Sequence, residues 1–307
     1  MSNLNSLNII KLIIRLLLGV FFISTAVLKL LSIDSFEVYI YSFGIVNYIT
    51  VTFLSRLLIS IELLIGISLI FKIYFRQVWW LTMLMMAGFT LFLIYAAIFR
   101  NDSNCHCFGS LVELNPIQSI IKNIITIALL LLIRKEQSHD YKPLLRKWLA
   151  VFTIATSFVI SFVLLPMDVI YNKIYSDKEN VNTMAFYESL SDSTHVDLQH
   201  GRYLINYALA GCKFCRIGAE KLTLMADRHQ IPHNRIKFIV GGSDEAIVRF
   251  VELTGTSDYG HWKIPAPEFM AITYGQFPLY VFVEDGKVVK AGDFRILDDY
   301  LIMSLNN

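Results

Sequence analysis

The four cysteines of the chain fall into two close pairs. Cys105 and Cys107 lie in "NCHCFGSLVELNP", and Cys212 and Cys215 lie in "LINYALAGCKFCRIGAEKL". Thiols at such spacings can form a structural disulfide, contribute ligands to a metal ion, or cycle between dithiol and disulfide forms. The sequence around each pair bears on the choice among these three chemistries.

The composition indicates a membrane protein. The chain has 307 residues, of which 55% are hydrophobic, and a mean hydropathy of +0.54, which is too apolar for a soluble protein of this length. Its net charge is +2, and no basic patch with interleaved aromatic residues predicts nucleic-acid binding. A bilayer core requires roughly 20 apolar residues per helix. The segments that meet this length are about 9–31, 47–71, 78–99, 117–133 and 148–170.

The positively charged residues of the loops predict the orientation in the membrane. Lysine and arginine are concentrated in loops 72–77 and 134–147, whereas loop 32–46 has none and loop 100–116 has only Arg100. Because basic loops stay on the cytoplasmic side, we expect a multi-pass protein of the cell (inner) membrane with a cytoplasmic N-terminus. The chain after residue 170 would then be extracytoplasmic. Both cysteine pairs would share that face, where disulfides can form.

The second cysteine pair lies between a predicted strand, "RYLINYAL", and a predicted helix that follows it. The N-terminus of a helix favours a thiolate, and Lys213 and Arg216 add positive charge nearby. We therefore predict that Cys212 is the nucleophile and that Cys215 is the resolving thiol. An inert disulfide staple is the alternative. No metal is expected, because the histidines of this region lack paired zinc-ligand spacing.

The C-terminal part of the chain alternates between strand and helix patterns. After a polar linker over 171–200, a strand, the C-x-x-C, a helix, a second strand and a second helix precede a hairpin with an Asp285-Gly286 turn and a final helix. This order resembles a thioredoxin-like domain over 201–307, which implies an α/β fold and a cis Pro278 beside the dithiol. The chain departs from that family in Ala210-Gly211, where a tryptophan-containing run is usual, and in an insertion over 255–275.

The Cys105/Cys107 pair is a weaker signal by itself. Cysteines two positions apart can form a disulfide only in a tight geometry that makes the bond more reducible, and Gly109 permits a sharp backbone there. A static loop clip, two small buried residues, and a Cys-His-Cys metal site remain open. The compartment that this pair would share with "CKFC" favours a redox use.

Three segments of the membrane part resemble a known family. They are "RLLLGVFFISTAVLKL" (15–30), "SIELLIGISL" with an intramembrane Glu62, and "CHCFG" followed by "NPIQSIIKN". These are similar to the methylamine-utilisation MauE family of the DoxX-like group, over about residues 8–135. The resemblance implies a four-helix membrane domain that supports maturation of exported proteins by thiol-disulfide chemistry, with Cys105 and Cys107 as the family cysteines. His106 stands where glycine is common in that family.

Charged residues within the predicted spans require partners, because an unpaired charge in the membrane is costly. Arg15 and Glu62 lie about 9 Å and about 14 Å from the cytoplasmic ends of their helices, at about 1.5 Å of rise per residue. We therefore expect an Arg15–Glu62 pair that joins the first two spans, with a proton or quinone role as the alternative. Lys29 and Arg56 lie nearer the outer face, where they could snorkel or line a cavity below the cysteine loop.

These observations predict a transmembrane helical bundle followed by an α/β domain. The expected divisions are a MauE/DoxX-like domain over 1–135, a cytoplasmic loop and fifth span over 136–170, the linker over 171–200, and the thioredoxin-like domain over 201–307.

The predicted function is that of a membrane-bound thiol-disulfide oxidoreductase. It would relay electrons between Cys105/Cys107 and Cys212/Cys215 and act on exported protein substrates. The predicted cytoplasmic side carries no cysteine, which favours an oxidative or isomerising role with a quinone-like acceptor, although no quinone motif is present. The alternative is a non-enzymatic membrane assembly factor with a thioredoxin-fold binding module and structural cysteines. A transporter is disfavoured, because the chain shows no internal repeat.

Overall fold

The computed structural model describes residues 6–100, 102, 104–105, 107–110, 114–136, 141–175, 181–193 and 198–306. His106 and parts of the predicted loop and linker, at 137–140, 176–180 and 194–197, lie outside the described residues. The chain divides into two compact units that interleave in sequence. The first unit consists of Met1–Tyr39 and Phe53–Pro166, and the second of Ile40–Thr52 and Met167–Asn307.

Among the described residues, five helices are long and apolar enough to cross a bilayer. They are α1 (Ser6–Leu30), α3 (Tyr48–Phe71), α4 (Phe75–Phe99), α5 (Pro116–Ile133) and α6 (Pro143–Phe162). This confirms the prediction of a multi-pass helical membrane protein. The fifth helix begins and ends earlier than the predicted 148–170, because Pro143 starts it and the chain leaves the helix before Pro166.

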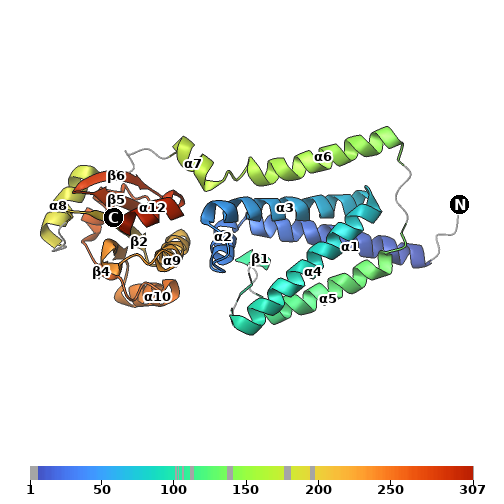
Figure 1. The fold of residues 1–307 in the computed structure, drawn as a ribbon, viewed down its shortest axis with the longest axis horizontal. Helices are drawn as coiled ribbons and strands as arrows, with labels where there is room; N and C mark the ends of the chain where they lie inside the picture. The colour runs from blue at the N-terminus through green and yellow to red at the C-terminus, as the bar shows by residue number, and fades with distance from the viewer. Residues whose placement is uncertain are drawn as a thin grey trace. The chain divides into compact units, whose positions relative to one another are not determined.

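The core of the first unit is built from α1, α3, α4 and α5, whose helices are drawn in blue to green in Figure 1. The buried side chains that they share include Leu18, Phe22, Ile65, Leu69, Phe75, Trp79, Met86 and Leu130. Helix α5 starts with a capping box, in which Asn115 accepts from the Gln118 N–H and the Gln118 side chain accepts from the Asn115 N–H. This cap fixes the point at which the loop containing Cys105 and Cys107 enters the helix.

The charged side chains of the first unit pair differently from the prediction. Glu62 binds Lys29 with an oxygen–nitrogen distance of 2.8 Å. Arg15 binds Glu136 at 3.2 Å and donates to the Ile70 carbonyl oxygen at 2.6 Å. The predicted Arg15–Glu62 pair is therefore wrong.

The direction of helical side chains explains this error. Helices α1 and α3 are antiparallel with Gly19 beside Gly66, which places Lys29 and Arg15 on opposite sides of the level of Glu62. Side chains on a helix lean toward its N-terminus. Along α1, Lys29 therefore leans toward Glu62, whereas Arg15 leans away from it.

The second unit contains a five-stranded mixed sheet in the order β4-β3-β2-β5-β6, within the part of the chain that is described. Its strands are β2 (Arg202–Leu209), β3 (Ile236–Gly241), β4 (Gly260–Trp262), β5 (Leu279–Glu284) and β6 (Lys287–Gly292). Strand β2 is parallel to β3 and antiparallel to β5, and β4 is parallel to β3, whereas β6 is antiparallel to β5. This arrangement agrees with the predicted α/β class.

Helices cover both faces of the sheet (Figure 1). Helices α8 (Thr183–Ser193) and α11 (Ala266–Thr273) pack on one face. Helix α9 (Lys213–Arg228) packs on the other, beside α10 (Asp244–Thr254). Phe186 of α8 is fully buried in this core, so the stretch predicted as a polar linker contributes to the hydrophobic core.

The end of the chain has the predicted hairpin and a shorter helix than expected. Asp285 and Gly286 both have positive φ angles, 46° and 75°, as a two-residue hairpin turn requires. After it come a 3-10 turn, η3 (Phe294–Ile296), helix α12 (Asp299–Met303) and a second 3-10 turn. The predicted insertion over 255–275 supplies β4 and α11.

The second unit also includes the short segment Ile40–Thr52. Asp299 holds this segment by two hydrogen bonds, which it accepts from the Tyr41 hydroxyl at 2.6 Å and from the Tyr48 N–H at 2.7 Å. Asp299 also pairs with His229, at the C-terminal end of α9, at 2.7 Å. The remaining helix of the unit, α7 (Asp168–Tyr175), precedes α8 in the chain.

Candidate functional site

Cys212 caps the N-terminus of helix α9. Its sulfur accepts a hydrogen bond from the Cys215 N–H at 3.3 Å, and its own N–H donates to the Leu209 carbonyl oxygen at 3.0 Å. The residue is partly exposed. Unpaired amides and the dipole at a helix N-terminus stabilise negative charge, so this sulfur is placed where a thiolate is favoured.

Cys215 lies one turn inside the same helix and is fully buried. Its sulfur accepts a hydrogen bond from the Leu209 N–H at 3.4 Å. Burial raises the pKa of the Cys215 thiol, and its hydrogen bond to the Cys212 sulfur raises it further. Both cysteines are free thiols. The pair thus consists of one accessible sulfur and one shielded, protonated thiol.

The residues predicted to support this pair include Lys213 and Pro278, which lie in different elements of the second unit. Lys213 is the first residue of α9 and is exposed. The Phe277–Pro278 peptide bond is cis, as the thioredoxin-like resemblance implies. Pro278 lines a cavity of about 580 Å³ whose other lining residues are Tyr171, Asn172, Gly275, Gln276, Phe277, Leu279, Gly292, Asp293 and Ile296.

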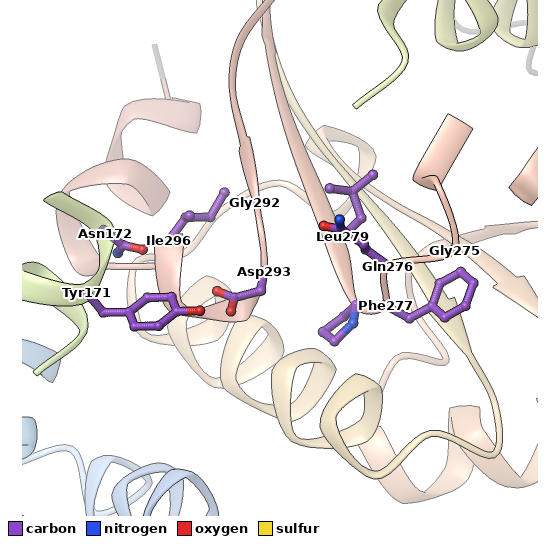
Figure 2. Close-up of a pocket in the computed structure, with 10 residues that line it drawn as sticks. Tyr171, Asn172, Gly275, Gln276, Phe277, Leu279, Gly292, Asp293 and Ile296 are labelled. Atoms are coloured by element: carbon purple, nitrogen blue, oxygen red, sulfur yellow. The ribbon is translucent and has the colours of Figure 1, made fainter. Parts of the chain in front are cut away.

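Asp293 is the acidic residue of that cavity. Figure 2 shows its carboxylate between Tyr171 of α7 and Phe277. Burial raises the pKa of Asp293, while a hydrogen bond from the Arg295 N–H at 2.9 Å acts in the opposite direction. The cavity therefore has both an apolar wall and a carboxyl group.

In the first unit, Cys105 is held by the residues that start helix α5. Its N–H donates to the Leu114 carbonyl oxygen at 2.8 Å, and its sulfur lies 2.9 Å from the Ser119 hydroxyl. The Cys107 N–H donates to the same sulfur at 3.3 Å. Cys105 is 2% exposed, whereas Cys107 is more accessible. The two thiols are again unequal in exposure.

Their acidities are also unequal. A hydrogen bond from the Cys107 thiol lowers the pKa of Cys105 to about 6 against the effect of burial, and Ser119 and the Cys107 N–H act in the same direction. The pKa of Cys107 is raised, chiefly because its thiol donates to Cys105 and also because it is buried. Cys105 is therefore the more acidic thiol of the pair.

The backbone after Cys107 fits closely against helix α1. Strand β1 (Cys107–Ser110) contains Gly109 at φ +68°, and a Cβ there would lie 2.6 Å from the Leu28 carbonyl oxygen. Only glycine avoids both the strain of a positive φ angle and the steric clash of a Cβ atom. The Lys122 ammonium lies 4.8 Å from the centre of the Phe108 ring. These contacts fix the loop against α1 and α5.

Of the charged membrane residues singled out in the sequence, Lys29 and Glu62 lie near the Cys105/Cys107 loop, whereas Arg15 does not. Lys29 is close enough to lower the pKa of Cys107, so its ion pair with Glu62 lies near this loop. Arg15 lies 14 positions before Lys29 on α1, which is about 21 Å along the helix. Arg15 therefore takes no part in the cysteine site.

Among the residues that the structure describes, no group of three or more histidine, cysteine, aspartate or glutamate side chains could hold a metal ion. His106 of the Cys-His-Cys sequence lies outside those residues. Both cysteine pairs combine a more exposed sulfur with a shielded one, which suits thiol-disulfide exchange.

Sequence reasoning missed several residues at these sites. Ser119 carried a signal, because it follows the helix start "NP" by three positions and so falls in the first turn. Asn206 and Tyr280, on the sheet face below α9, carried a weaker one, as polar groups within otherwise apolar strands. Asp293 comes to its cavity only through the tertiary fold, and no local pattern points to it.

Comparisons with known proteins find a family for the membrane part and a relative for part of the chain. The model of the family described as "Methylamine utilisation protein MauE" matches residues 7–134, which confirms the resemblance seen over about 8–135. The chain is 40% identical over 126 residues to "Protein TlpB" of Flavobacterium psychrophilum, in an alignment that covers 38% of this chain. The chain spans about a third, 34%, of the length of that relative. No solved structure matches the chain.

Proposed function

We propose that the chain is a membrane-bound thiol-disulfide oxidoreductase that acts on exported proteins. The observation that carries the proposal is the asymmetry of the second cysteine pair. The Cys212 sulfur is accessible and accepts an amide hydrogen bond at a helix N-terminus, while Cys215 is buried behind it. The strand–C-x-x-C–helix order and the mixed sheet support a thioredoxin-like domain.

The reaction with substrate begins from the disulfide form of Cys212 and Cys215. A substrate thiolate attacks the accessible Cys212 sulfur, the bond between the two cysteines breaks, and Cys215 leaves and takes up a proton. A second substrate thiol loses its proton and attacks the substrate sulfur of this mixed disulfide, releasing Cys212. The substrate gains one disulfide, and the chain gains two electrons and two protons.

The membrane pair then reoxidises the second pair. The Cys212 thiolate attacks the sulfur of Cys107 in a Cys105–Cys107 disulfide, because Cys107 is the more accessible of the two. Cys105 leaves, and its acidity makes it a good leaving group, since thiols of lower pKa leave faster. Cys215 next attacks the Cys212 sulfur and releases Cys107. The membrane pair ends reduced and the other pair oxidised.

A two-electron acceptor must restore the Cys105–Cys107 disulfide. A quinone dissolved in the bilayer has this chemistry and can reach a membrane unit. The basic loops 72–77 and 134–147 support an orientation in which both cysteine pairs lie on the extracytoplasmic side. We therefore propose that electrons flow from exported substrates through Cys212/Cys215 and Cys105/Cys107 to a quinone.

The relay is tested by trapping its mixed disulfide. In the full chain reconstituted in lipid nanodiscs, the Cys105→Ser/Cys215→Ser variant keeps only Cys107 and Cys212. Mild oxidation should produce a Cys107–Cys212 disulfide, which mass spectrometry of a non-reduced digest identifies. The matched Cys107→Ser/Cys215→Ser variant keeps the buried Cys105 and should give far less product.

The outcomes of these experiments distinguish the relay from its alternatives. If neither variant yields the disulfide and neither loses activity in cells, the relay is refuted and a non-enzymatic assembly factor with structural cysteines is favoured. Equal yields would refute the route through Cys107. In cells, a respiratory inhibitor should convert Cys105 and Cys107 to the reduced form, and their redox state is read by alkylation before and after treatment. No change would refute the quinone as acceptor.

A further inference from the structure

Two polar side chains lie buried side by side in the sheet of the second unit. Asn206 on β2 is the direct cross-strand partner of Tyr280 on β5. Both residues are fully buried. Within the described part of the chain, neither the two amide atoms of Asn206 nor the Tyr280 hydroxyl has a hydrogen-bond partner. Buried polar groups are normally satisfied, so such a pair calls for an explanation.

The pair lies on the sheet face that helix α9 covers. A Cβ placed on Gly218 of α9 would be 2.5 Å from the Tyr280 hydroxyl, so this hydroxyl touches the helix backbone. Gly218 follows Cys215 by three positions, which puts both residues on the same side of the helix. Burial raises the pKa of Tyr280, and the charge of Cys215 adds to this effect. The Tyr280 hydroxyl and its cross-strand neighbour Asn206 therefore lie below the side of α9 that carries the buried thiol.

The surroundings of the pair are otherwise apolar. The buried residues that share this face of the central strands are Leu204, Ala208, Ile236, Phe238, Val240 and Phe282. A thiolate formed in such surroundings is strongly disfavoured unless it receives hydrogen bonds. The amide nitrogen of Asn206 and the hydroxyl of Tyr280 are both hydrogen-bond donors.

We propose that Asn206 and Tyr280 are positioning residues that donate hydrogen bonds to the Cys215 sulfur when it becomes a thiolate. This inference rests on the proposed function and concerns its resolving step. In that step the Cys215 thiol loses its proton, and the thiolate attacks Cys212 in the mixed disulfide. The bond from Cys212 to the bound thiol breaks, and the departing thiolate takes up a proton. The donors stabilise the charge on Cys215 at the moment of attack.

Tyr207 provides a matched control. It is the next residue of β2 and is fully buried, and its hydroxyl also has no hydrogen-bond partner among the described residues. It faces the opposite side of the sheet, within the core formed with α8 and α11. Tyr280→Phe and Tyr207→Phe therefore remove the same atom from equally buried positions, but only Tyr280 lies on the side of Cys215.

The resolving step can be measured directly in the full chain. In a Cys105→Ser/Cys107→Ser background in nanodiscs, the Cys212 thiolate attacks one equivalent of a symmetric aromatic disulfide. It forms a mixed disulfide with one half of the reagent and releases the other half as a first coloured thiolate. Attack by Cys215 then releases the second aromatic thiolate, and the rate of this second release is followed as a function of pH. Tyr280→Phe and Asn206→Leu should each slow the release by about tenfold at neutral pH, the effect of one hydrogen bond to a charged group.

The pH profile distinguishes this role from a merely structural one. In Tyr280→Phe and Asn206→Leu the rate should rise only at higher pH, because the Cys215 thiolate is harder to form, whereas Tyr207→Phe should keep the parent profile. Equal profiles for Tyr280→Phe and Tyr207→Phe would overturn the inference; if Tyr280→Phe does not fold, Asn206→Leu against Tyr207→Phe decides it in the same way. If the parent background forms no adduct or never releases it, the proposed function itself fails.

Discussion

Gly19 and Gly66 face each other where helices α1 and α3 cross. A Cβ on Gly19 would lie 2.9 Å from the Gly66 carbonyl oxygen, and a Cβ on Gly66 would lie 2.8 Å from that of Gly19. Small residues allow membrane helices to approach this closely. The contact sets the register of the two helices and so brings Lys29 to Glu62.

A side chain at this crossing should destabilise the first unit. Gly66→Ala places a methyl group against the α1 backbone, which cannot move aside without separating the helices, and should lower the free energy of unfolding by about 1–3 kcal/mol. Thermal unfolding in detergent micelles measures the change. Gly88→Ala in α4 is the control, because a Cβ there meets nothing within 4 Å, and it should be neutral. A similar loss in both variants would contradict the role of the crossing.

The partners of the buried charges can be established by double-mutant cycles. Glu62→Gln leaves Lys29 buried without its counter-charge, and this should cost about 3–5 kcal/mol, much of which the added Lys29→Met change should restore. Arg15→Met combined with Glu62→Gln should instead be additive within about 0.5 kcal/mol. The free energy of unfolding in micelles is the measurement. Strong coupling between positions 15 and 62 would restore the pairing that the sequence suggested.

The acidity of Cys105 should depend on Ser119. In a Cys212→Ser/Cys215→Ser background, the thiolate absorbance in the ultraviolet should titrate with a pKa of about 6, which belongs to Cys105. Ser119→Ala removes one hydrogen bond to the charged form, so the pKa should rise and the thiolate fraction at neutral pH should fall. Thr126→Ala, farther along α5, is a hydroxyl control and should leave the titration unchanged. A titration unaffected by Ser119→Ala would refute this assignment.

Asp299 should make the protection of segment 40–52 depend on pH. Burial raises the pKa of Asp299, but hydrogen bonds from His229, Tyr41 and the Tyr48 N–H outweigh it and lower the pKa overall. A carboxylate with a lowered pKa stabilises the fold above its unfolded pKa of about 3.9, and the contribution is lost as pH falls through the folded pKa. The Tyr48 amide should therefore lose hydrogen-exchange protection in acid.

Substitution provides the check on this effect. Asp299→Asn cannot accept all three hydrogen bonds, so it should reduce the protection of the Tyr48 amide already at neutral pH. Asp244→Asn is the control, because Asp244 is exposed and pairs with Lys263 at the surface. Unchanged protection in Asp299→Asn would show that other contacts hold the segment.

Local patterns predicted much of the fold. The apolar spans, the Asn115-Pro116 helix start, the strand before "CKFC" and the Asp285-Gly286 turn were all recognised, because each depends on neighbouring residues. The segment over 171–200 was harder, since its few apolar side chains, such as Phe186, are diluted by polar ones and show no periodicity. The ends of helices near proline were predicted to within several residues of the ends seen in the structure.

Contacts between residues that are distant in the sequence were harder to predict. The depth of Arg15 and Glu62 could be estimated from helix rise, but the register of α1 on α3 depends on Gly19 and Gly66, which no periodicity reveals. The place of Tyr280 opposite Asn206 required the order and register of the strands. For the cysteines, the sequence predicted their roles, whereas their relative exposure came only from the fold.

The interleaving of the two units limits how the chain can be divided. Segment Ile40–Thr52 lies between two membrane helices in sequence, yet it completes the α/β unit through Asp299. A fragment that begins at Met167 would lack this part of its own fold and would expose the surface that binds it. An exchange of the C-terminal domain between relatives would therefore have to carry residues 40–52 with it, as a second and separate insert.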